Sequence, residues 1–391
     1  MTKTPCFQID ESALKAETKA LKQALSDHWG PAFSIGWSVK TNSLPWLLSF
    51  FHSEGLRAEA VSETEYALVR RIGFSDREII YNGPIKDRDI FFRILTAGGL
   101  VNVDSHQELA WLSEYAGDPA AAPVSVGIRA NIHLPGEDPS HFGFSHENGA
   151  LGEALEKLKA LPNVRVAGLH MHRSTQSRTT EIYRSLARAA AQIAEEYALE
   201  LSYVDMGGGF FGGRPDKPSF DEYFSVIAEE LKHAFDPAKT MLIAEPGISL
   251  VSSAFTLHTG ILDTKPVADA LYHITDGSRM NLNPQVTRHV YPHHVEYADE
   301  NTPPEERPKV PLQWITGFTC MEYDKLFPLE NAPQLFPGDR IVYEKAGGYT
   351  LALNPLFIRY LPDVYVKHAD GSTSRVREAW GIEEYLQKNV W

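Results

Sequence analysis

The stretch FSIGWSVKTNS, residues 33–43, runs from apolar side chains into a single lysine, Lys40, and then becomes polar. Its first residues have the apolar and aromatic character of a buried strand. A lysine is rarely buried unless it is paired with, or bonded to, another group. The role of Lys40 at the end of such a strand therefore depends on what the rest of the chain builds around it.

Strand-like runs recur along the chain up to Gly247 and alternate with segments whose apolar residues are spaced by three and four. Eight strand–helix units within about 250 residues are the count and span of a (β/α)8 TIM barrel. A doubly wound open sheet is the alternative, but it rarely needs eight regular units. We therefore predict an α/β fold with a barrel over residues 12–250. The runs end at Lys40, Ser62, Pro84, Ser105, Ile132, His172, Gly209 and Gly247.

After Gly247 the pattern changes to alternating polar and apolar residues with glycines and prolines, as in GDRIVYEKAGGYTLALNP, residues 338–355. Such segments are typical of antiparallel strands. We predict a second, mostly antiparallel β domain, of the β-sandwich or β-barrel type, over residues 251–391. The N-terminal residues 1–11 hold a short strand-like piece, which we expect to join this domain.

Composition restricts the class of protein. The chain has 391 residues, 43% hydrophobic and 23% charged, as in an ordinary soluble globular protein. Its formal charge of −14 argues against nucleic acid or an anionic membrane as a partner. The two cysteines, Cys6 and Cys320, form no disulfide framework, and no apolar run resembles a signal peptide or a membrane span. We expect a cytoplasmic protein.

In a barrel of this kind, catalytic groups lie at the C-terminal ends of the strands. A lysine, a histidine ring, a carboxylate and a glycine-rich turn would meet there, and together they suit pyridoxal phosphate. Taken singly, the glycines could form only a tight turn and the lysine only an ion pair. The residues at the predicted strand ends are Lys40, Ser62, Glu65, Asn82, Asp104, Arg129, His172, Gly207, Gly208, Gly209 and Glu245.

These segments resemble the fold-type III pyridoxal-phosphate-dependent decarboxylases, the family of diaminopimelate, ornithine and arginine decarboxylases. That family shares its barrel with the alanine racemases. The resemblance extends over nearly the whole chain and rests on motifs in their family order. They are SVKTNS, AVSETE, VNVDSHQEL, GLHMHRSTQ, DMGGGF, AEPG, DGS, GFTC and AGGYT.

The resemblance implies roles for individual residues toward the cofactor. Lys40 would form the Schiff base, His172 would stack on the ring, and Glu245 would hold the pyridine nitrogen. A carboxylate at that nitrogen favours decarboxylation, since the racemases are similar but have an arginine there. The implied phosphate contacts are Thr175, Gly207, Gly208, Gly209, Gly247 and Tyr349.

The resemblance also implies a homodimer with shared active sites. Cys320 would reach the site of the neighbouring subunit, where it or Lys40 would protonate the product carbanion. Asp276 would be a substrate-side acid. Glu322 and Arg279 are further candidates for substrate binding.

Two departures from the family pattern affect the expected substrate. Ile248 stands where relatives carry a phosphate-binding arginine, so another cation such as Arg173 would contribute. Met321 stands where relatives carry the acid for a distal amine, with Glu322 one residue later. The altered segment 276–294 adds Arg288. We therefore expect an amino acid, or an amino-acid conjugate, whose side chain is acidic, extended or joined to another group.

Three other functions fit parts of the sequence. A racemase is disfavoured by Glu245, and a non-enzymatic pyridoxal-phosphate carrier would not need the second domain. A metal-dependent hydrolase could use His170 and His172, which lie on one face of a strand. It would leave Lys40 and the glycine triplet unexplained. Its additional ligands would be His289, His293 and His294.

Overall fold

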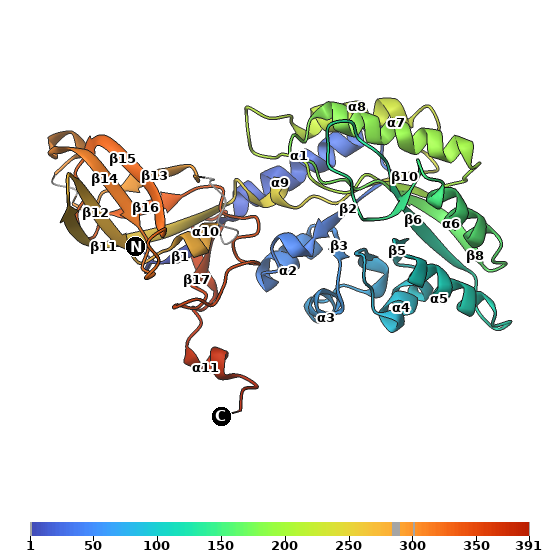
Figure 1. The fold of residues 1–391 in the computed structure, drawn as a ribbon, viewed down its shortest axis with the longest axis horizontal. Coiled ribbons are helices and arrows are strands. Elements are labelled where there is room, and N and C mark those ends of the chain that lie inside the picture. The colour runs from blue at the N-terminus through green and yellow to red at the C-terminus, as the bar shows by residue number, and fades with distance from the viewer. Residues whose placement is uncertain (1, 284–289, 300–301, 391) are drawn as a thin grey trace. The chain divides into compact units, whose positions relative to one another are not determined.

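The computed structural model describes residues 2–283, 290–299 and 302–390 (Figure 1). The chain divides into two compact units. The barrel unit is Glu17–Leu250, and the β unit consists of Met1–Ala16 and Val251–Trp391. The first division therefore falls inside the first helix, five residues after the position expected from the sequence, because this helix continues from one unit into the other.

The barrel unit is built on eight parallel strands that close into a ring, which confirms the predicted TIM barrel. Pairing of β5 with β6 and of β10 with β2 completes the ring. A two-residue strand, β7 (Phe144–Ser145), pairs in parallel with the end of β6. The barrel strands are β2 (Phe33–Ser38), β3 (Arg57–Ala60), β4 (Ile79–Tyr81), β5 (Leu100–Val103), β6 (Val124–Asn131), β8 (Val164–His170), β9 (Tyr203–Asp205) and β10 (Met241–Ala244).

Helices lie on the outside of the barrel strands (Figure 1). Serine side chains start several of them: Ser62, Ser105 and Ser219 each accept a hydrogen bond from the backbone N–H three residues later. The helices are α1 (Glu11–Trp29), α2 (Pro45–Ser53), α3 (Glu63–Ile72), α4 (Arg88–Ala97), α5 (His106–Ala116), α6 (Ala150–Lys159), α7 (Thr180–Glu196) and α8 (Phe220–Leu231), with a 3-10 turn at Asp76–Glu78.

The β unit contains a nine-stranded sheet that branches at β11. The N-terminal strand β1 lies between β11, to which it is antiparallel, and β17, to which it is parallel; Figure 1 shows this blue strand among orange and red ones. The β12–β14 pair is also parallel, and the other pairs are antiparallel. The strands are β1 (Cys6–Asp10), β11 (Phe255–Val267), β12 (Ala270–Thr275), β13 (His293–Glu296), β14 (Lys309–Thr316), β15 (Lys325–Pro333), β16 (Arg340–Tyr343), β17 (Asp363–Lys367) and β18 (Thr373–Arg377).

Short helical segments complete the described chain. They are α9 (Ile248–Val251), α10 (Arg279–Leu282), α11 (Ile382–Leu386) and 3-10 turns at Val39–Thr41 and Pro304–Glu306. Across the described ranges, none of the helices is both long enough and apolar enough to cross a membrane.

Tyr203 fills the inside of the barrel because two neighbouring strands carry glycine beside it. A Cβ atom at Gly168 would lie 1.9 Å from Tyr203 Cζ, and one at Gly127 would lie 2.3 Å from the Tyr203 hydroxyl oxygen. The Tyr203 side chain is buried, together with Ile80 and Ile243. These glycines therefore make room for a large side chain beneath the strand ends.

We predict that Gly168→Ala destabilises the barrel unit, because the new methyl group overlaps the Tyr203 ring. The expected loss in free energy of unfolding is about 1–3 kcal/mol, measured by urea denaturation. In a Tyr203→Ala background the same change should have a much smaller effect. An equal loss in both backgrounds would show that the overlap is not with Tyr203.

Candidate active site

Lys40 lies at the mouth of the barrel and pairs with a carboxylate that the sequence alone did not single out. Strand β2 ends at Ser38, two residues earlier than expected, and Lys40 belongs to the 3-10 turn that follows. Its Nζ lies 2.6 Å from Glu59 Oε2, which also accepts a hydrogen bond of 2.8 Å from Ser38 Oγ. The Lys40 side chain is 41% exposed, whereas that of Glu59 is 2% exposed. The amine is thus held by a buried anion yet open to the mouth.

Glu245 follows β10 and is buried beside two other titratable side chains. Asn82 Nδ2 donates to Glu245 Oε1 at 2.6 Å, and His170 Nε2 lies 3.3 Å from Glu245 Oε2. Burial alone would raise the pKa of Glu245, but the neighbouring His170 and Asp205 outweigh it and hold that pKa below its ordinary value. Burial and the charge of Glu245 raise the pKa of Asp205 well above its usual range. The two pKa shifts therefore favour the ionised form of Glu245 and the protonated form of Asp205.

His172 is held in one tautomer. Its Nδ1 accepts a hydrogen bond of 3.0 Å from Gly208 N–H, so in the neutral ring the proton is on Nε2. Burial, with the charge of Arg129 and the neighbouring His170, lowers the pKa of His172 well below its ordinary value. The His170 and His172 rings are nearly parallel, with centroids 6.1 Å apart. A neutral, oriented imidazole is therefore available at the mouth.

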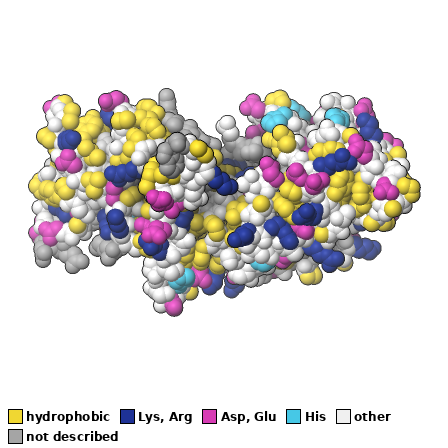
Figure 2. Space-filling model, turned by 90° about the horizontal axis from the view of Figure 1, so that it is seen from below, with side chains coloured by type: hydrophobic (Ala, Val, Ile, Leu, Met, Phe, Trp, Pro, Cys, Tyr) yellow, Lys and Arg dark blue, Asp and Glu magenta, His cyan; other side chains and the backbone are white. Residues whose placement is uncertain are grey.

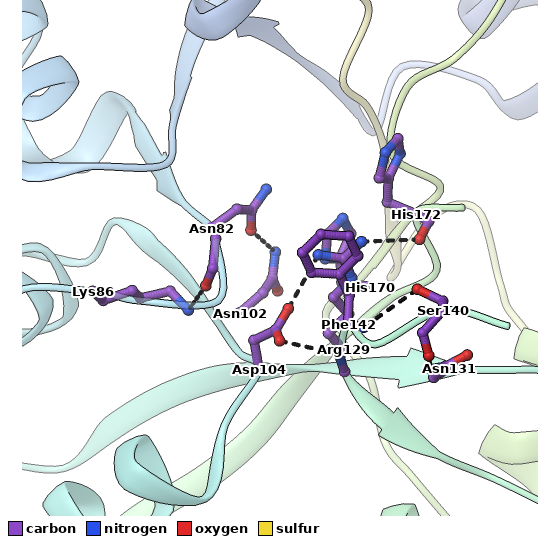
Figure 3. A network of polar contacts seen from close by, with 12 residues as sticks. Asn82, Lys86, Asn102, Asp104, Arg129, Asn131, Ser140, Phe142, His170 and His172 are labelled. Atoms are coloured by element: carbon purple, nitrogen blue, oxygen red, sulfur yellow. Dashed lines mark hydrogen bonds and ion pairs between the residues drawn. The ribbon is translucent and has the colours of Figure 1, made fainter. Parts of the chain in front are cut away.

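Arg129 connects β5, β6 and the segment after β8, as Figure 3 shows. Its Nη1 lies 3.0 Å from Asp104 Oδ2, and its Nη2 donates to the His172 carbonyl oxygen at 3.2 Å. The guanidinium carbon lies 4.7 Å from the centre of the Phe142 ring, and Gly143 N–H donates to Asp104 Oδ1. This ion pair thus fixes the backbone that carries His172.

A buried ion pair between Lys86 and Glu108 supports the backbone of Asp104, the partner of Arg129. Lys86 Nζ lies 3.0 Å from both oxygens of Glu108, whose Oε2 also accepts from Asp104 N–H at 2.9 Å. Burial lowers the pKa of Lys86 and raises that of Glu108. The pair fixes the end of β5, on which Asp104 sits.

The glycine triplet follows β9, as predicted, but two of its N–H groups are directed to side chains. Gly207 N–H donates to Asp205 Oδ1 at 2.8 Å, and Gly208 N–H donates to His172. Within the described ranges, no hydrogen bond is found for Gly209 N–H. The absence of Cβ atoms permits close packing, since a Cβ at Gly208 would lie 2.1 Å from the Glu245 carbonyl oxygen. A phosphate contact by the triplet therefore stays a prediction that involves chiefly Gly209.

A cavity of about 450 Å³ lies between the segments that follow β6 and β8. Its lining includes His172, Thr175 and three arginines, Arg129, Arg173 and Arg178. Arg173 Nη2 donates to the Asp138 carbonyl oxygen, but its Nε is buried without a partner among the described residues. Thr175 is buried and accepts from Arg178 N–H. The lining also includes Glu137 and Asp138, and Arg129 is paired with Asp104. The unmet buried donor of Arg173, with Arg178 beside the cavity, suits an anion.

Gly247 also lies at this mouth. A Cβ atom there would lie 2.3 Å from Thr41 Oγ1. The glycine therefore lets the end of β10 pack against the turn that carries Lys40.

The other predicted residues belong to the β unit. Asp276 is buried, and its Oδ1 accepts from Gly260 N–H at 2.8 Å. Tyr349 is 36% exposed. Arg279 opens α10 and donates from Nη1 to the Tyr323 carbonyl oxygen at 3.4 Å. Their roles toward cofactor and substrate remain predictions.

Asp324, which the sequence analysis missed, joins two of these segments. It accepts from Arg279 N–H at 2.8 Å and from Thr319 N–H at 3.1 Å, so it connects α10 to the loop that carries Cys320. Cys320 and Glu322 are exposed and line a cavity of about 510 Å³. Met321, Lys265 and Lys325 line the same cavity.

The histidines considered as metal ligands have other contacts. His293 stacks on Phe327 with ring centres 3.6 Å apart, and His294 lies 3.2 Å from Glu344; Arg288 and His289 lie outside the described residues. One group in the described chain, His170, Asp205 and Glu245, has potential ligand atoms within 4.8 Å of one another.

The sequence analysis missed the polar groups inside the strands. Glu59, Asn102 and Asp205 interrupt otherwise apolar runs, and all three are buried. A single acidic or amide side chain in a buried strand was the available signal, because such a group requires a partner. The partners themselves come from other strands, so the pattern of one strand could not identify them.

A closed barrel with a lysine, a neutral histidine and a buried carboxylate at its mouth defines an enzyme of the pyridoxal-phosphate barrel class. The sequence profile described as "Pyridoxal-dependent decarboxylase, pyridoxal binding domain" matches residues 11–252. The chain therefore belongs to this family, its cofactor is pyridoxal phosphate, and it is a carboxy-lyase that acts on an amino acid or an amino-acid conjugate.

Similar proteins extend over nearly the whole chain. L-glutamyl-(BtrI acyl-carrier protein) decarboxylase of Niallia circulans is 25% identical over 400 residues, covering 96% of this chain and 91% of that protein. Diaminopimelate decarboxylase of Archaeoglobus fulgidus is 26% identical over 373 residues, covering 90% and 85%. The crystal structure of diaminopimelate decarboxylase from M. jannaschi has a TM-score of 0.84 at 20% identity, covering 99% of this chain and 92% of that one. That structure supports the fold.

The residues at the mouth fit the cofactor. Lys40 is an accessible amine, Glu245 is a buried anion, and Arg173 offers a buried donor without a partner. When bound, pyridoxal phosphate supplies a conjugated ring that accepts electrons from the bond being broken.

We predict that His172 makes the stability of the cofactor-free protein depend on pH. Its pKa is lower in the folded than in the unfolded state, so below pH 6.5 the unfolded state binds the extra proton and stability falls. The loss is at most about 1.4 kcal/mol per pH unit. Urea unfolding between pH 7.5 and 5 should show a smaller slope for His172→Gln. Parallel curves for the two proteins would contradict the assignment.

Proposed function

We propose that the chain decarboxylates an amino acid whose distal part is extended or joined to a carrier, rather than a free basic amino acid. The observation that carries this proposal is Met321, which follows Cys320 at the cavity of about 510 Å³. A methionine cannot accept a hydrogen bond from a distal ammonium group as a carboxylate would. The relative from Niallia circulans is an L-glutamyl-(BtrI acyl-carrier protein) decarboxylase, which supports this substrate class.

The charges around Cys320 agree with this choice. Lys265 and Lys325 line the cavity, whereas Glu322 is displaced by one residue from the position of the usual acid. Lys325 Nζ lies 5.1 Å from the Tyr272 ring centre and 5.4 Å from that of Trp314, which orients its charge. The lining also includes the acids Glu322 and Asp324, so the cavity offers groups of both signs and Lys325 is the oriented cation that an anionic extension could meet.

The roles of the site residues form part of the same proposal. Lys40 binds the cofactor covalently, His172 packs on its ring, and Glu245 keeps its pyridine nitrogen protonated because it remains ionised. Arg173, Thr175, Gly209, Gly247 and Tyr349 hold the phosphate, with Arg173 and Arg178 taking the part of the arginine that Ile248 replaces. Cys320 or Lys40 returns a proton to the product.

We further propose that the enzyme is a cytoplasmic homodimer that does not bind nucleic acid. The net charge of −14 supports the last point, and on the face shown in Figure 2 basic side chains are interspersed with acidic ones. In the dimer, Cys320, Asp276, Arg279 and Glu322 would serve the site of the other subunit.

The first test of function is carbon dioxide release from free lysine, ornithine, diaminopimelate and glutamate, and from glutamate as a thioester on a carrier protein. We expect release from an extended substrate and little from the free diamino acids. Lys40→Ala should abolish both the visible absorption band of the bound cofactor and the release. Lys239→Ala, an exposed lysine, is the matched control and should retain both. Rapid turnover of free ornithine or lysine would refute the substrate class.

Met321→Asp should shift specificity toward free diamino acids. A carboxylate beside Cys320 would accept a charge-assisted hydrogen bond from the distal ammonium group, and such a bond corresponds to roughly a tenfold gain in kcat/KM. Steady-state kinetics with ornithine and lysine measures the gain. If kcat/KM for these substrates did not increase, Met321 would not be the residue that sets this preference.

The shared site predicts complementation between subunits. Lys40→Ala and Cys320→Ala proteins should each be inactive or strongly impaired. After they are unfolded and refolded together, roughly a quarter of wild-type activity should return, because half of the dimers are mixed and each contains one intact site. Activity that remained at the sum of the two variants would contradict a shared site.

A further inference from the structure

A chain of buried side-chain hydrogen bonds runs inside the barrel mouth. Tyr203 donates from its hydroxyl group to Asn102 Oδ1 at 2.9 Å, and Asn102 Nδ2 donates to Asn82 Oδ1 at 2.9 Å. Figure 3 shows the contact between the two asparagines. Asn82 Nδ2 then donates to two carboxylates, Glu245 Oε1 at 2.6 Å and Glu59 Oε1 at 3.3 Å.

Asn82 thereby bridges the carboxylate beside Lys40 and the carboxylate at the end of β10. Asn82 is 4% exposed, Glu59 2% and Glu245 5%, so none of these polar groups relies on bulk water. Two buried carboxylates of like charge favour uptake of a proton by one of them unless donors stabilise both. A single side-chain amide supplies its two N–H groups to this pair.

The two carboxylates determine the orientation of the Asn82 amide, because their oxygens accept hydrogen bonds and only the NH2 group can donate to both. The Asn82 Oδ1 is then left to accept from Asn102 Nδ2, and Asn102 Oδ1 accepts from the Tyr203 hydroxyl group. Gly127 and Gly168 leave the space that the Tyr203 ring occupies. The chain of hydrogen bonds therefore runs from the packed interior of the barrel to the two carboxylates.

We propose that Asn82 is a positioning residue, which donates to Glu59 and Glu245 and so holds both carboxylates in fixed positions toward Lys40 and the cofactor ring. The role rests on the proposed assignments of Lys40 and Glu245. Asn82 acts through the two carboxylates and is not itself required to touch the substrate. The other titratable groups around the two carboxylates are Lys40, Glu65, His170, His172 and Asp205.

The test uses the pH dependence of the visible absorption spectrum of the holoenzyme, with kcat and KM measured in parallel. Asn82→Asp keeps the size of the side chain but replaces its NH2 donor with an oxygen. The variant therefore places a third carboxylate beside Glu59 and Glu245. We expect the midpoint of the spectral pH transition to shift by one pH unit or more. The value of kcat should fall at least tenfold, with a smaller change in KM.

Two further variants keep the proposal open to refutation if Asn82→Asp does not fold or bind cofactor. Tyr203→Phe removes only the hydroxyl donor at the far end of the chain of hydrogen bonds, and it should shift the midpoint in the same direction by a smaller amount. Asn163→Asp is the matched control, because Asn163 lies just before β8 at the opposite end of the strands and contacts Ala121. It should leave the midpoint and kcat unchanged.

The outcomes separate this proposal from the proposed function. A normal midpoint in Asn82→Asp or, if that variant is lost, in Tyr203→Phe would overturn the role of Asn82. An equal shift in Asn163→Asp would also overturn it, because the effect would then be one of general charge. If wild-type enzyme shows the cofactor band but none of the chosen substrates releases carbon dioxide, the substrate class fails while the spectral test of Asn82 still applies.

Discussion

The active-site mouth depends on hydrogen-bond partners for two buried carboxylates in a place with little water. Glu59 and Glu245 are each less than one-tenth exposed, and a buried carboxylate requires partners. Lys40 and Ser38 contact Glu59, His170 lies beside Glu245, and Asn82 donates to both carboxylates. These partners come from several different strands, so this arrangement of the site requires a closed barrel.

The barrel meets this requirement through a layer of residues beneath the mouth. Glycines at positions 127 and 168 allow Tyr203 to occupy the interior, and Tyr203 fixes Asn102 and through it Asn82. Asp104 lies two residues after Asn102, and its ion pair with Arg129 fixes the backbone at His172. The side chains that pack the core therefore also position the polar groups at the mouth. A substitution in the core can change the chemistry of the site even though the substituted residue contacts no ligand.

The β unit is organised around a buried acid of its own. Asp324 accepts hydrogen bonds from the backbone at Arg279 and at Thr319, and it thereby sets the loop that presents Cys320, Met321 and Glu322. Cys320 and Glu322 are exposed, whereas the buried residue that supports their loop accepts hydrogen bonds from several donors. Exposed residues of such a loop can change while its conformation is retained.

Much of this protein could be predicted from its sequence. The repeated alternation of strand and helix patterns predicted the barrel, because each strand–helix unit must bury its apolar face against neighbouring units. The groups at the predicted strand ends suited pyridoxal phosphate, and the resemblance of the motifs around Lys40, His172 and Glu245 to a known family implied the class of reaction.

Only the tertiary structure decided which polar groups are partners. Glu59, Asn102, Asp205 and Asp324 were not identified from the sequence, and the N–H groups of Gly207 and Gly208 were expected to face a phosphate rather than Asp205 and His172. A local pattern reports whether a residue is buried. The identity of the group opposite it depends on closure of the sheet, which brings together residues more than a hundred positions apart, as with Asn82 and Glu245.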